Sequence, residues 1–240
     1  MIKINNLTIG YQNKAVLNDV NLTIEQGKII GLIGKSGCGK TTLLKSLYNH
    51  NLILDGEILF DNLNIKKSSK KQINKLLKSV QVVSNDDFML EEYDLVSNVL
   101  LTFNNYNNVF YKILKILSKK QVGQLLELLD ELNIKEFAFK KFKDLSQGQK
   151  QRAILIKALF NQFDILILDE PTSALDINNA NLVMQKLNSL KINKYIILAI
   201  HDLNLALEYC DTLVAIKDNK VQAIINKNDF NQEDLIKYFD

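Results

Sequence analysis

Cysteine, proline and tryptophan are scarce or missing in this chain of 240 residues, which has two Cys, one Pro and no Trp. Two cysteines are too few for a disulfide framework, and such usage is typical of proteins from reducing compartments. The sequence also lacks any apolar run of the roughly 18–20 residues that a membrane-spanning helix needs. Because residues 1–6 have no long apolar core, we expect no secretory signal. These absences predict a soluble protein, which could still dock on a membrane protein.

A strong charge of either sign is missing as well. The 30 Lys and Arg nearly balance the 27 Asp and Glu, giving a formal net charge of +3. This mildly basic balance does not indicate nucleic-acid binding by itself, and we expect no nucleic-acid partner. Hydrophobic residues make up 47% of the chain, which is typical of a globular protein with one sizeable core or a core and a subdomain.

Glycine is also uncommon, and three of the nine glycines fall within residues 34–41. This stretch has the pattern of Gly, four residues, Gly, Lys and Thr. It lies between an apolar run at 28–33 and a segment at 42–47 that is compatible with a helix. A strand, a glycine-rich loop and a helix in this order predict a phosphate-binding loop. The alternative is a plain turn, but a plain turn rarely needs three glycines followed by Lys and Thr.

The chemistry of this loop follows from its residue types. Glycines let backbone N–H groups turn toward an anion, and the following helix directs the positive end of its dipole to the same place. Lys40 can reach the β- and γ-phosphates of a nucleotide, and the hydroxyl of Thr41 can bind Mg²⁺. The candidate phosphate-binding residues are Gly34, Lys35, Ser36, Gly37, Cys38, Gly39, Lys40, Thr41 and Thr42.

Two more apolar runs end in polar residues that can face a ligand. Residues 165–168 lead into Asp169 and Glu170. Residues 195–200 lead into His201. Because ligands bind at the carboxyl ends of strands in open α/β sheets, we expect Asp169 to hold Mg²⁺, Glu170 to activate water as a general base, and His201 to contact a γ-phosphate. The alternatives are ordinary polar residues at strand exits and a structural histidine.

A second candidate anion site precedes the predicted helix at 153–160. Ser146, Gly148 and Gln149 stand just before it, where helix N–H groups can meet an anion. Ser146 is also explained as a simple helix N-cap. A simple cap does not account for Gln147, Gly148 and Gln149, so the sequence favours an anion contact.

The rest of the chain is predicted to form further strands and helices. The expected strands are at 2–9, 18–24, 57–60, 79–84, 212–217 and 221–225, with turns at 11–14, 55–56 and 61–62. The expected helices are at 68–78, 95–102, 109–117, 121–132 and 203–209, with a last one starting at Gln232. Tyr11 lies in the first turn, where it is equally compatible with stacking on an adenine ring and with an ordinary edge-strand tyrosine.

Together these stretches resemble the ATPase subunit of ABC transporters over nearly the whole chain. Six motifs in the right order carry the resemblance. They are an A-loop aromatic at Tyr11, a Walker A loop at 34–41, a signature at 145–149, a Walker B strand at 165–170, a D-loop at 173–176 and a switch histidine at His201. Through the D-loop, the resemblance adds Asp176 to the nucleotide-binding residues.

The resemblance implies an α/β fold, with a RecA-like P-loop NTPase core, an N-terminal antiparallel β region and an inserted α-helical subdomain. It implies a single ABC ATPase domain over residues 1–240. Residues 1–84 and 160–240 would form the nucleotide-binding core, and residues 85–159 would form the helical subdomain that carries the signature.

The resemblance also implies cofactors and partners. ATP and Mg²⁺ would bind between two copies packed head to tail, with Lys40 and Thr41 from one copy and the signature residues from the other. The helical subdomain would contact transmembrane permease subunits, and a substrate-binding lipoprotein would take part indirectly. The chain would lie peripherally on the cytoplasmic face of the cell membrane, where ATP hydrolysis powers transport.

Two positions depart from the family pattern. Asn85 stands where the family has Gln at the junction with the helical subdomain. It is expected to reach Mg²⁺ and the attacking water with a side chain that is one methylene shorter. Gln147 replaces a Gly of the signature, but Ser146 and Gly148 remain, so we expect the γ-phosphate contact to survive.

Within the family, the chain is most similar to the phosphonate-type importer ATPases, through residues 56–61, 111–120 and 205–211. Phosphonates or related small solutes are therefore the candidate cargo. One alternative is a non-transport ABC ATPase that acts on ribosomes or DNA, and the length of a single cassette argues against it. The other is a degenerate cassette that only binds ATP; the presence of Glu170 and His201 argues against that, whereas Asn85 in place of Gln keeps this alternative open.

Overall fold

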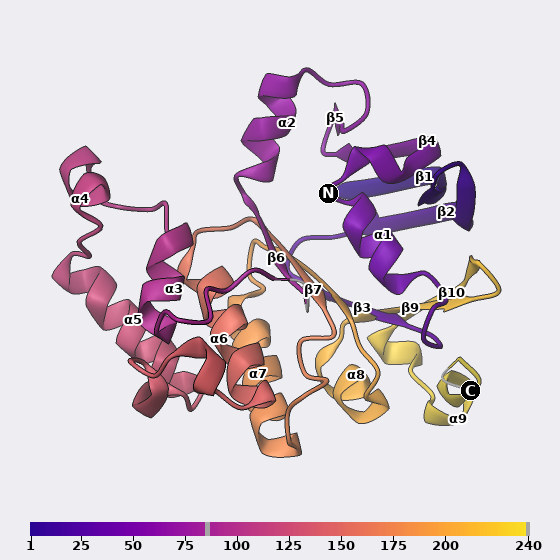
Figure 1. Ribbon diagram of the computed structural model, residues 1–240. Coiled ribbons are helices and arrows are strands. Elements are labelled where there is room, and N and C mark those ends of the chain that lie inside the picture. The colour runs from indigo at the N-terminus through magenta and orange to yellow at the C-terminus, as the bar shows by residue number, and fades with distance from the viewer. Residues whose placement is uncertain (85–86, 239–240) are drawn as a thin grey trace.

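A six-stranded sheet lies at the centre of the computed structural model, which describes residues 1–84 and 87–238 (Figure 1). Its order is β10-β9-β3-β8-β7-β6, in which neighbours are parallel except for β10 beside β9. The strands are β3 (Ile29–Ile33), β6 (Val80–Val83), β7 (Ile165–Asp169), β8 (Tyr195–Ala199), β9 (Thr212–Lys217) and β10 (Lys220–Asn226). Because β3, β8 and β7 are adjacent and parallel, the polar residues that follow them meet at one edge of the sheet.

Helices surround this sheet, and α3, α4 and α5 lie together at one side of the molecule (Figure 1). The α-helices are α1 (Lys40–Ser46), α2 (Lys70–Leu77), α3 (Leu95–Thr102), α4 (Val109–Leu114), α5 (Lys119–Glu131), α6 (Gln147–Phe160), α7 (Ile177–Leu190), α8 (Leu203–Tyr209) and α9 (Gln232–Ile236). Short 3-10 helices occur at His50–Leu52, Lys135–Phe137, Phe142–Asp144 and Lys227–Asp229. Within the described ranges, no helix combines the length and the apolar character needed to cross a membrane.

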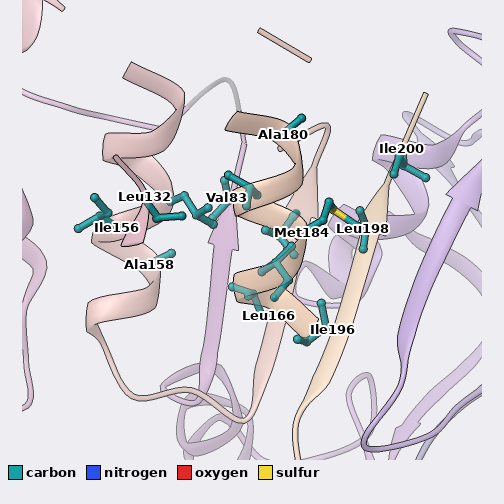
Figure 2. Close-up of a cluster of buried hydrophobic side chains, with 14 of the residues drawn as sticks. Val83, Leu132, Ile156, Ala158, Leu166, Ala180, Met184, Ile196, Leu198 and Ile200 are labelled. Atoms are coloured by element: carbon teal, nitrogen blue, oxygen red, sulfur yellow. The ribbon is translucent and has the colours of Figure 1, made fainter. Parts of the chain in front are cut away.

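Both faces of the central sheet are buried, which explains why its parallel strands are continuous apolar runs. On β3, Ile29 and Ile33 belong to one hydrophobic cluster, whereas Ile30 and Leu32 belong to a second cluster on the opposite face. Figure 2 shows part of the first cluster, in which Leu166 and its neighbours on the sheet face residues of α6 and α7. The strands that deliver the polar residues are therefore fixed from both sides.

A second, antiparallel sheet has the order β2-β1-β4-β5. Its strands are β1 (Ile2–Tyr11), β2 (Lys14–Ile24), β4 (Ile53–Phe60) and β5 (Leu63–Asn64). Side chains of this sheet share a buried cluster with Leu43 and Leu44 of α1 and with one face of the central sheet. The antiparallel sheet thus supports α1 at the point where that helix follows the glycine-rich loop.

The turn expected at 55–56 is wrong, because these residues lie within β4. Gly56 has φ 76°, and a Cβ there would lie 2.3 Å from the carbonyl oxygen of Asn6 in β1. The pairing of the two strands is irregular at this point. The glycine therefore serves the close approach of two backbones, whereas a chain reversal is the usual interpretation of an Asp-Gly pair.

Three helices differ from the expectation. Helix α6 begins at Gln147 rather than at residue 153, and α4 ends at Leu114 rather than at residue 117. Helix α7 has no counterpart among the expected helices. Its buried residues follow the helical spacing, but its four asparagines are poor helix formers and obscure that pattern. The buried residues are Ala180, Val183, Met184 and Leu187.

Candidate functional site

Residues 34–41 form a loop between the carboxyl end of β3 and the start of α1. Gly34 has φ 148°, and a Cβ there would lie 2.3 Å from the carbonyl oxygen of Ile216. Gly39 is the N-cap of α1 at φ 112°, and a Cβ there would lie 2.8 Å from Cγ of Leu17. Both positions require glycine. Because Gly39 has no side chain that could cap the helix, the first N–H groups of α1 can be used by an anion.

The ammonium group of Lys40 lies inside this loop. Its Nζ donates to the carbonyl oxygen of Gly34 at 2.6 Å and to that of Lys35 at 3.1 Å. Only 5% of Lys40 is exposed. Neutral carbonyls do not cancel the charge of this cation, so the loop is electrostatically suited to an anion.

Thr41 and Asp169 bring the loop and β7 together. Oγ1 of Thr41 donates to Oδ1 of Asp169 at 3.1 Å. Burial raises the pKa of Asp169 above its ordinary value, the hydrogen bond from Thr41 opposes this, and the neighbouring charge of Glu170 raises the pKa further. A cation bound at this carboxylate would relieve the cost of its buried negative charge.

Glu170 and His201 form a second pair beside the first, at the ends of β7 and β8. Nε2 of His201 lies 2.6 Å from Oε1 of Glu170, so the ring N–H can donate to the carboxylate. A cleft of about 530 Å³ opens at this pair, and Ser36, Ser173 and Asp202 also line it. The structure therefore brings the loop, a carboxylate and an imidazole to one cleft, as expected from the strand ends.

The signature residues stand at the start of α6, where they form a capping box. The N–H of Gln149 donates to Oγ of Ser146 at 3.3 Å, and the N–H of Ser146 donates to Oε1 of Gln149 at 2.9 Å. The cap thus accounts for Gln149 as well as Ser146, so the expectation from the sequence that a cap leaves Gln149 unexplained is wrong, while the anion contact stays a prediction. Gly148 packs against the D-loop, since a Cβ there would lie 2.9 Å from the carbonyl oxygen of Ala174.

Arg152 is a buried residue that the motif reasoning missed. Its Nη1 donates to the carbonyl oxygens of Leu132 and Asn133 at 2.9 and 2.8 Å, and to Oδ1 of Asn179 at 2.7 Å. Its Nε donates to the carbonyl oxygen of Gly148 at 3.3 Å. Burial lowers the pKa of Arg152, although the nearby Asp176 opposes that effect. A signal was available, because this is the only arginine in the sequence.

Three candidate residues stand apart from the cleft or outside the described ranges. Tyr11 ends β1 and is 47% exposed at a two-residue turn. Asp176 caps α7 by accepting from the N–H of Asn179 at 2.9 Å, and hydrogen bonds from Asn179 lower the pKa of Asp176. Asn85 lies outside the described residues. The geometry therefore shows Asp176 as a helix cap and leaves the nucleotide contacts of Asp176, Tyr11 and Asn85 as predictions.

The family described as ABC transporter matches residues 17–173, from β2 through the loop and α6 to the turn after β7. The chain belongs to the ABC transporter family. The resemblance inferred from the sequence is thus confirmed, and so is the α/β P-loop NTPase fold. The chain is an ATPase of the ABC class.

Relatives of this ABC ATPase include two phosphonates import ATP-binding proteins. The one from Fusobacterium nucleatum subsp. nucleatum is 31% identical over 241 residues, which cover 100% of this chain and 98% of the relative. The one from Mesoplasma florum is 37% identical over 216 residues, which cover 87% of this chain and 86% of the relative. The solved structures include the ATP-binding cassette MJ0796, a dimer in a post-hydrolysis state bound to ADP and Pi. It has a TM-score of 0.79 and 27% identity, covering 96% of this chain and 100% of that chain.

Proposed function

We propose that this chain is the subunit that binds and hydrolyses ATP to power solute import through a separate membrane permease. The observation that carries the proposal is the juxtaposition of two pairs at adjacent strand ends. Thr41 and Asp169 are 3.1 Å apart, and Glu170 and His201 are 2.6 Å apart. One pair is suited to a metal and the other to an attacking water, beside a loop that is suited to phosphates.

ATP would place its phosphates in the loop at 34–41, with Lys40 directed to the β- and γ-phosphates. Thr41 and Asp169 fit Mg²⁺, because both are oxygen ligands and the half-buried carboxylate gains from a cation. Across 1–84 and 87–238, no group of three or more His, Cys, Asp or Glu side chains forms a ready metal site, so phosphate and water oxygens would complete the shell. When bound, Mg²⁺ would neutralise charge on the phosphate oxygens.

Glu170 would act as the general base. Its carboxylate takes a proton from water as the water oxygen attacks the γ-phosphorus and the bond to ADP breaks. His201 would keep the carboxylate in place through the 2.6 Å hydrogen bond and would reach the γ-phosphate. Asn85 would help to orient the metal and the water.

A second copy of the chain would complete the site. Ser146, Gly148 and Gln149 of one copy would contact the nucleotide held by the loop of the other, as would Asp176, while Tyr11 would stack on the adenine ring. The dimeric state of the related cassette supports this arrangement.

We further propose phosphonates or related small solutes as the cargo, because relatives that cover 100% and 87% of this chain are phosphonates import ATP-binding proteins. The nucleotide-binding core would comprise residues 1–84 and 160–240. Residues 85–159 would form the helical subdomain that meets the permease, on the cytoplasmic face of the membrane. A lipoprotein would deliver the solute, and phosphonate-stimulated ATPase activity of the reconstituted complex would test this assignment.

The substitution Glu170→Gln tests the proposed reaction. It removes the base but keeps the size of the side chain, so we expect turnover to fall by ~10²–10⁴-fold while ATP still binds. Size-exclusion chromatography with ATP should then show a stable dimer. Glu208→Gln, an exposed position on α8, serves as the matched control and should hydrolyse ATP at the wild-type rate. Normal turnover by Glu170→Gln would refute the role of Glu170.

A further inference from the structure

Gln151, in α6, is a buried glutamine whose side-chain amide holds the backbone around Glu170. Only 8% of Gln151 is exposed. Its Nε2 donates to the carbonyl oxygen of Glu170 at 2.7 Å and lies 3.2 Å from Oγ of Ser173. Its Oε1 accepts from the N–H of Ala174 at 3.0 Å. A backbone carbonyl can only accept and a backbone N–H can only donate, so these partners determine the orientation of the amide.

Glu170 needs such support because of its backbone conformation. Its φ of 55° lies in the left-handed region, which a residue with a side chain occupies only when its surroundings hold it there. Its N–H donates to the carbonyl oxygen of Ala199 at 3.2 Å. Its own carbonyl oxygen accepts from Gln151 and, at 3.1 Å, from Oγ of Ser173. Because hydrogen bonds hold both the backbone N–H and the carbonyl oxygen of Glu170, its carboxylate stays directed at His201.

Gln151 also belongs to the helix that begins with the signature. It lies two residues after Gln149, so the first turns of α6 carry both the signature and the contact with Glu170. In the proposed dimer, the signature of one copy meets the nucleotide of the other. A movement of the start of α6 would therefore be transmitted to the backbone of Glu170 through the side chain of Gln151.

We propose that Gln151 is a positioning residue that directs the carboxylate of Glu170 and links its position to the signature helix. The inference rests on the proposed function of Glu170. Through Gln151, the base in one site would respond to the nucleotide in the other, because α6 serves the partner's site and Glu170 serves its own. Dimer closure would then position the carboxylate of Glu170 as well as complete the phosphate contacts.

The first test replaces Gln151 with Met, which has a similar length but can make none of the three hydrogen bonds. We expect kcat to fall by about 10-fold or more, a part of the ~10²–10⁴-fold that a general base supplies. The KM for ATP and the Kd of a fluorescent ATP analogue should stay within about twofold of wild type. Gln162→Met, at an exposed position between α6 and β7, is the control and should keep wild-type values. Either an unchanged kcat or a loss of nucleotide binding in Gln151→Met overturns the proposal.

The second test asks whether Gln151 acts through Glu170. In a Glu170→Gln background, Gln151→Met should reduce the residual turnover no further, and the ATP-bound dimer should persist. A role in general folding predicts the opposite, because its effect would add to that of Glu170→Gln and would weaken the dimer. Additive losses therefore contradict the inference.

The third test is independent of activity. Hydrogen exchange of the amide of Ala174 should be faster in Gln151→Met than in wild type, since its acceptor is gone. Gln151→Glu keeps that acceptor but cannot donate to Glu170 as a carboxylate, so it should keep the protection and still lose kcat. If the wild-type chain hydrolyses no ATP, the proposed function fails and the exchange rate alone decides the contact. If the wild type is active and exchange is unchanged in Gln151→Met, the inference fails and the proposed function stands.

Discussion

Helices α1 and α6 both begin at candidate phosphate contacts, but the two helix starts are built differently. Helix α1 follows Gly39, which has no side chain with which to cap it. Helix α6 follows Ser146, and a capping box joins Ser146 and Gln149 through two reciprocal hydrogen bonds. The first helix start is open to an anion, whereas the second is satisfied within its own chain.

This difference indicates that the two halves of the proposed site have different requirements. The loop half is shaped by backbone geometry and folds around Lys40 in a single chain. At the signature half, Ser146 must exchange internal hydrogen bonds for contacts with a phosphate held by another copy. We therefore expect the loop to bind nucleotide in the monomer and the signature to engage only in the dimer, where ATP favours the closed state.

The largest expected effect comes from Lys40→Ala, which removes the cation at the centre of the loop half. We expect hydrolysis to fall by at least about 10²–10³-fold, the scale for losing one group that stabilises transition-state charge. Affinity for ATP should fall too, because the monomeric loop is the first binding site. Titration calorimetry and a phosphate-release assay measure both quantities. Lys75→Ala, at an exposed position on α2, is the control. Wild-type affinity for ATP in Lys40→Ala would contradict the view that the loop of the monomer is the first binding site.

A smaller effect is expected from Ser146→Ala, for which the chain offers a matched control. The capping box of α5 joins Ser118 and Gln121 with distances of 3.0 and 3.4 Å, close to the 2.9 and 3.3 Å at α6. Ser146→Ala and Ser118→Ala should each lower the free energy of unfolding by ~1 kcal/mol in urea titrations.

Only the variant at the signature should affect catalysis. We expect Ser146→Ala to lower kcat by about 10²-fold, while Ser118→Ala keeps the wild-type kcat. ATP binding to the monomer should be unchanged in both, since the loop half is intact. Equal kcat values for the two variants would show that the start of α6 is a helix cap and nothing more.

The smallest expected effect is the change in the free energy of unfolding caused by Asp169→Asn. Burial raises the pKa of Asp169, so the folded state binds its proton more tightly than the unfolded state does. The contribution of Asp169 to the free energy of unfolding is therefore greatest at low pH. It is lost as the pH rises from the pKa of Asp169 in the unfolded state through its pKa in the folded state. Asp169→Asn stays neutral and can still accept from Thr41, so we expect a higher free energy of unfolding at pH 7.

Urea unfolding at several pH values checks this prediction. The advantage of Asp169→Asn should shrink as the pH falls toward the ordinary carboxyl range, because the native side chain then becomes neutral as well. Asp218→Asn, at an exposed turn position, should match wild type throughout. A variant at Asp169 that is less stable than wild type at pH 7 would show that the ionised carboxylate is favoured by the fold.

The parts of the fold that could be predicted from sequence are those whose signals are local. The apolar strands that end at Asp169 and His201 are continuous because both faces of the sheet are buried, and such runs are visible in sequence. The loop at 34–41 is recognisable because its glycines are close together. These two signals were enough to place three strand ends at one edge.

Most of the remaining features of the fold and the site could not be predicted, because they depend on contacts between segments that are distant in sequence. Gly56 serves an approach to β1 that no local pattern shows. The reciprocal hydrogen bonds of Ser146 and Gln149 are the exception, because they are local and match the Ser-x-x-Gln pattern of a capping box. Gln151 contacts Glu170 across 19 positions of the chain, and only the packing of α6 against the turn after β7 reveals that link.

The hydrogen bonds of Arg152 join three helices of the molecule. Every other cationic side chain among the 30 Lys and Arg is a lysine, so the guanidinium stands where a fork of several N–H groups is needed. It ties the chain after α5, the first turn of α6 and Asn179 in the first turn of α7. Arg152 therefore links these three helices at their ends, and we expect a displacement of one of them to be passed on to the other two.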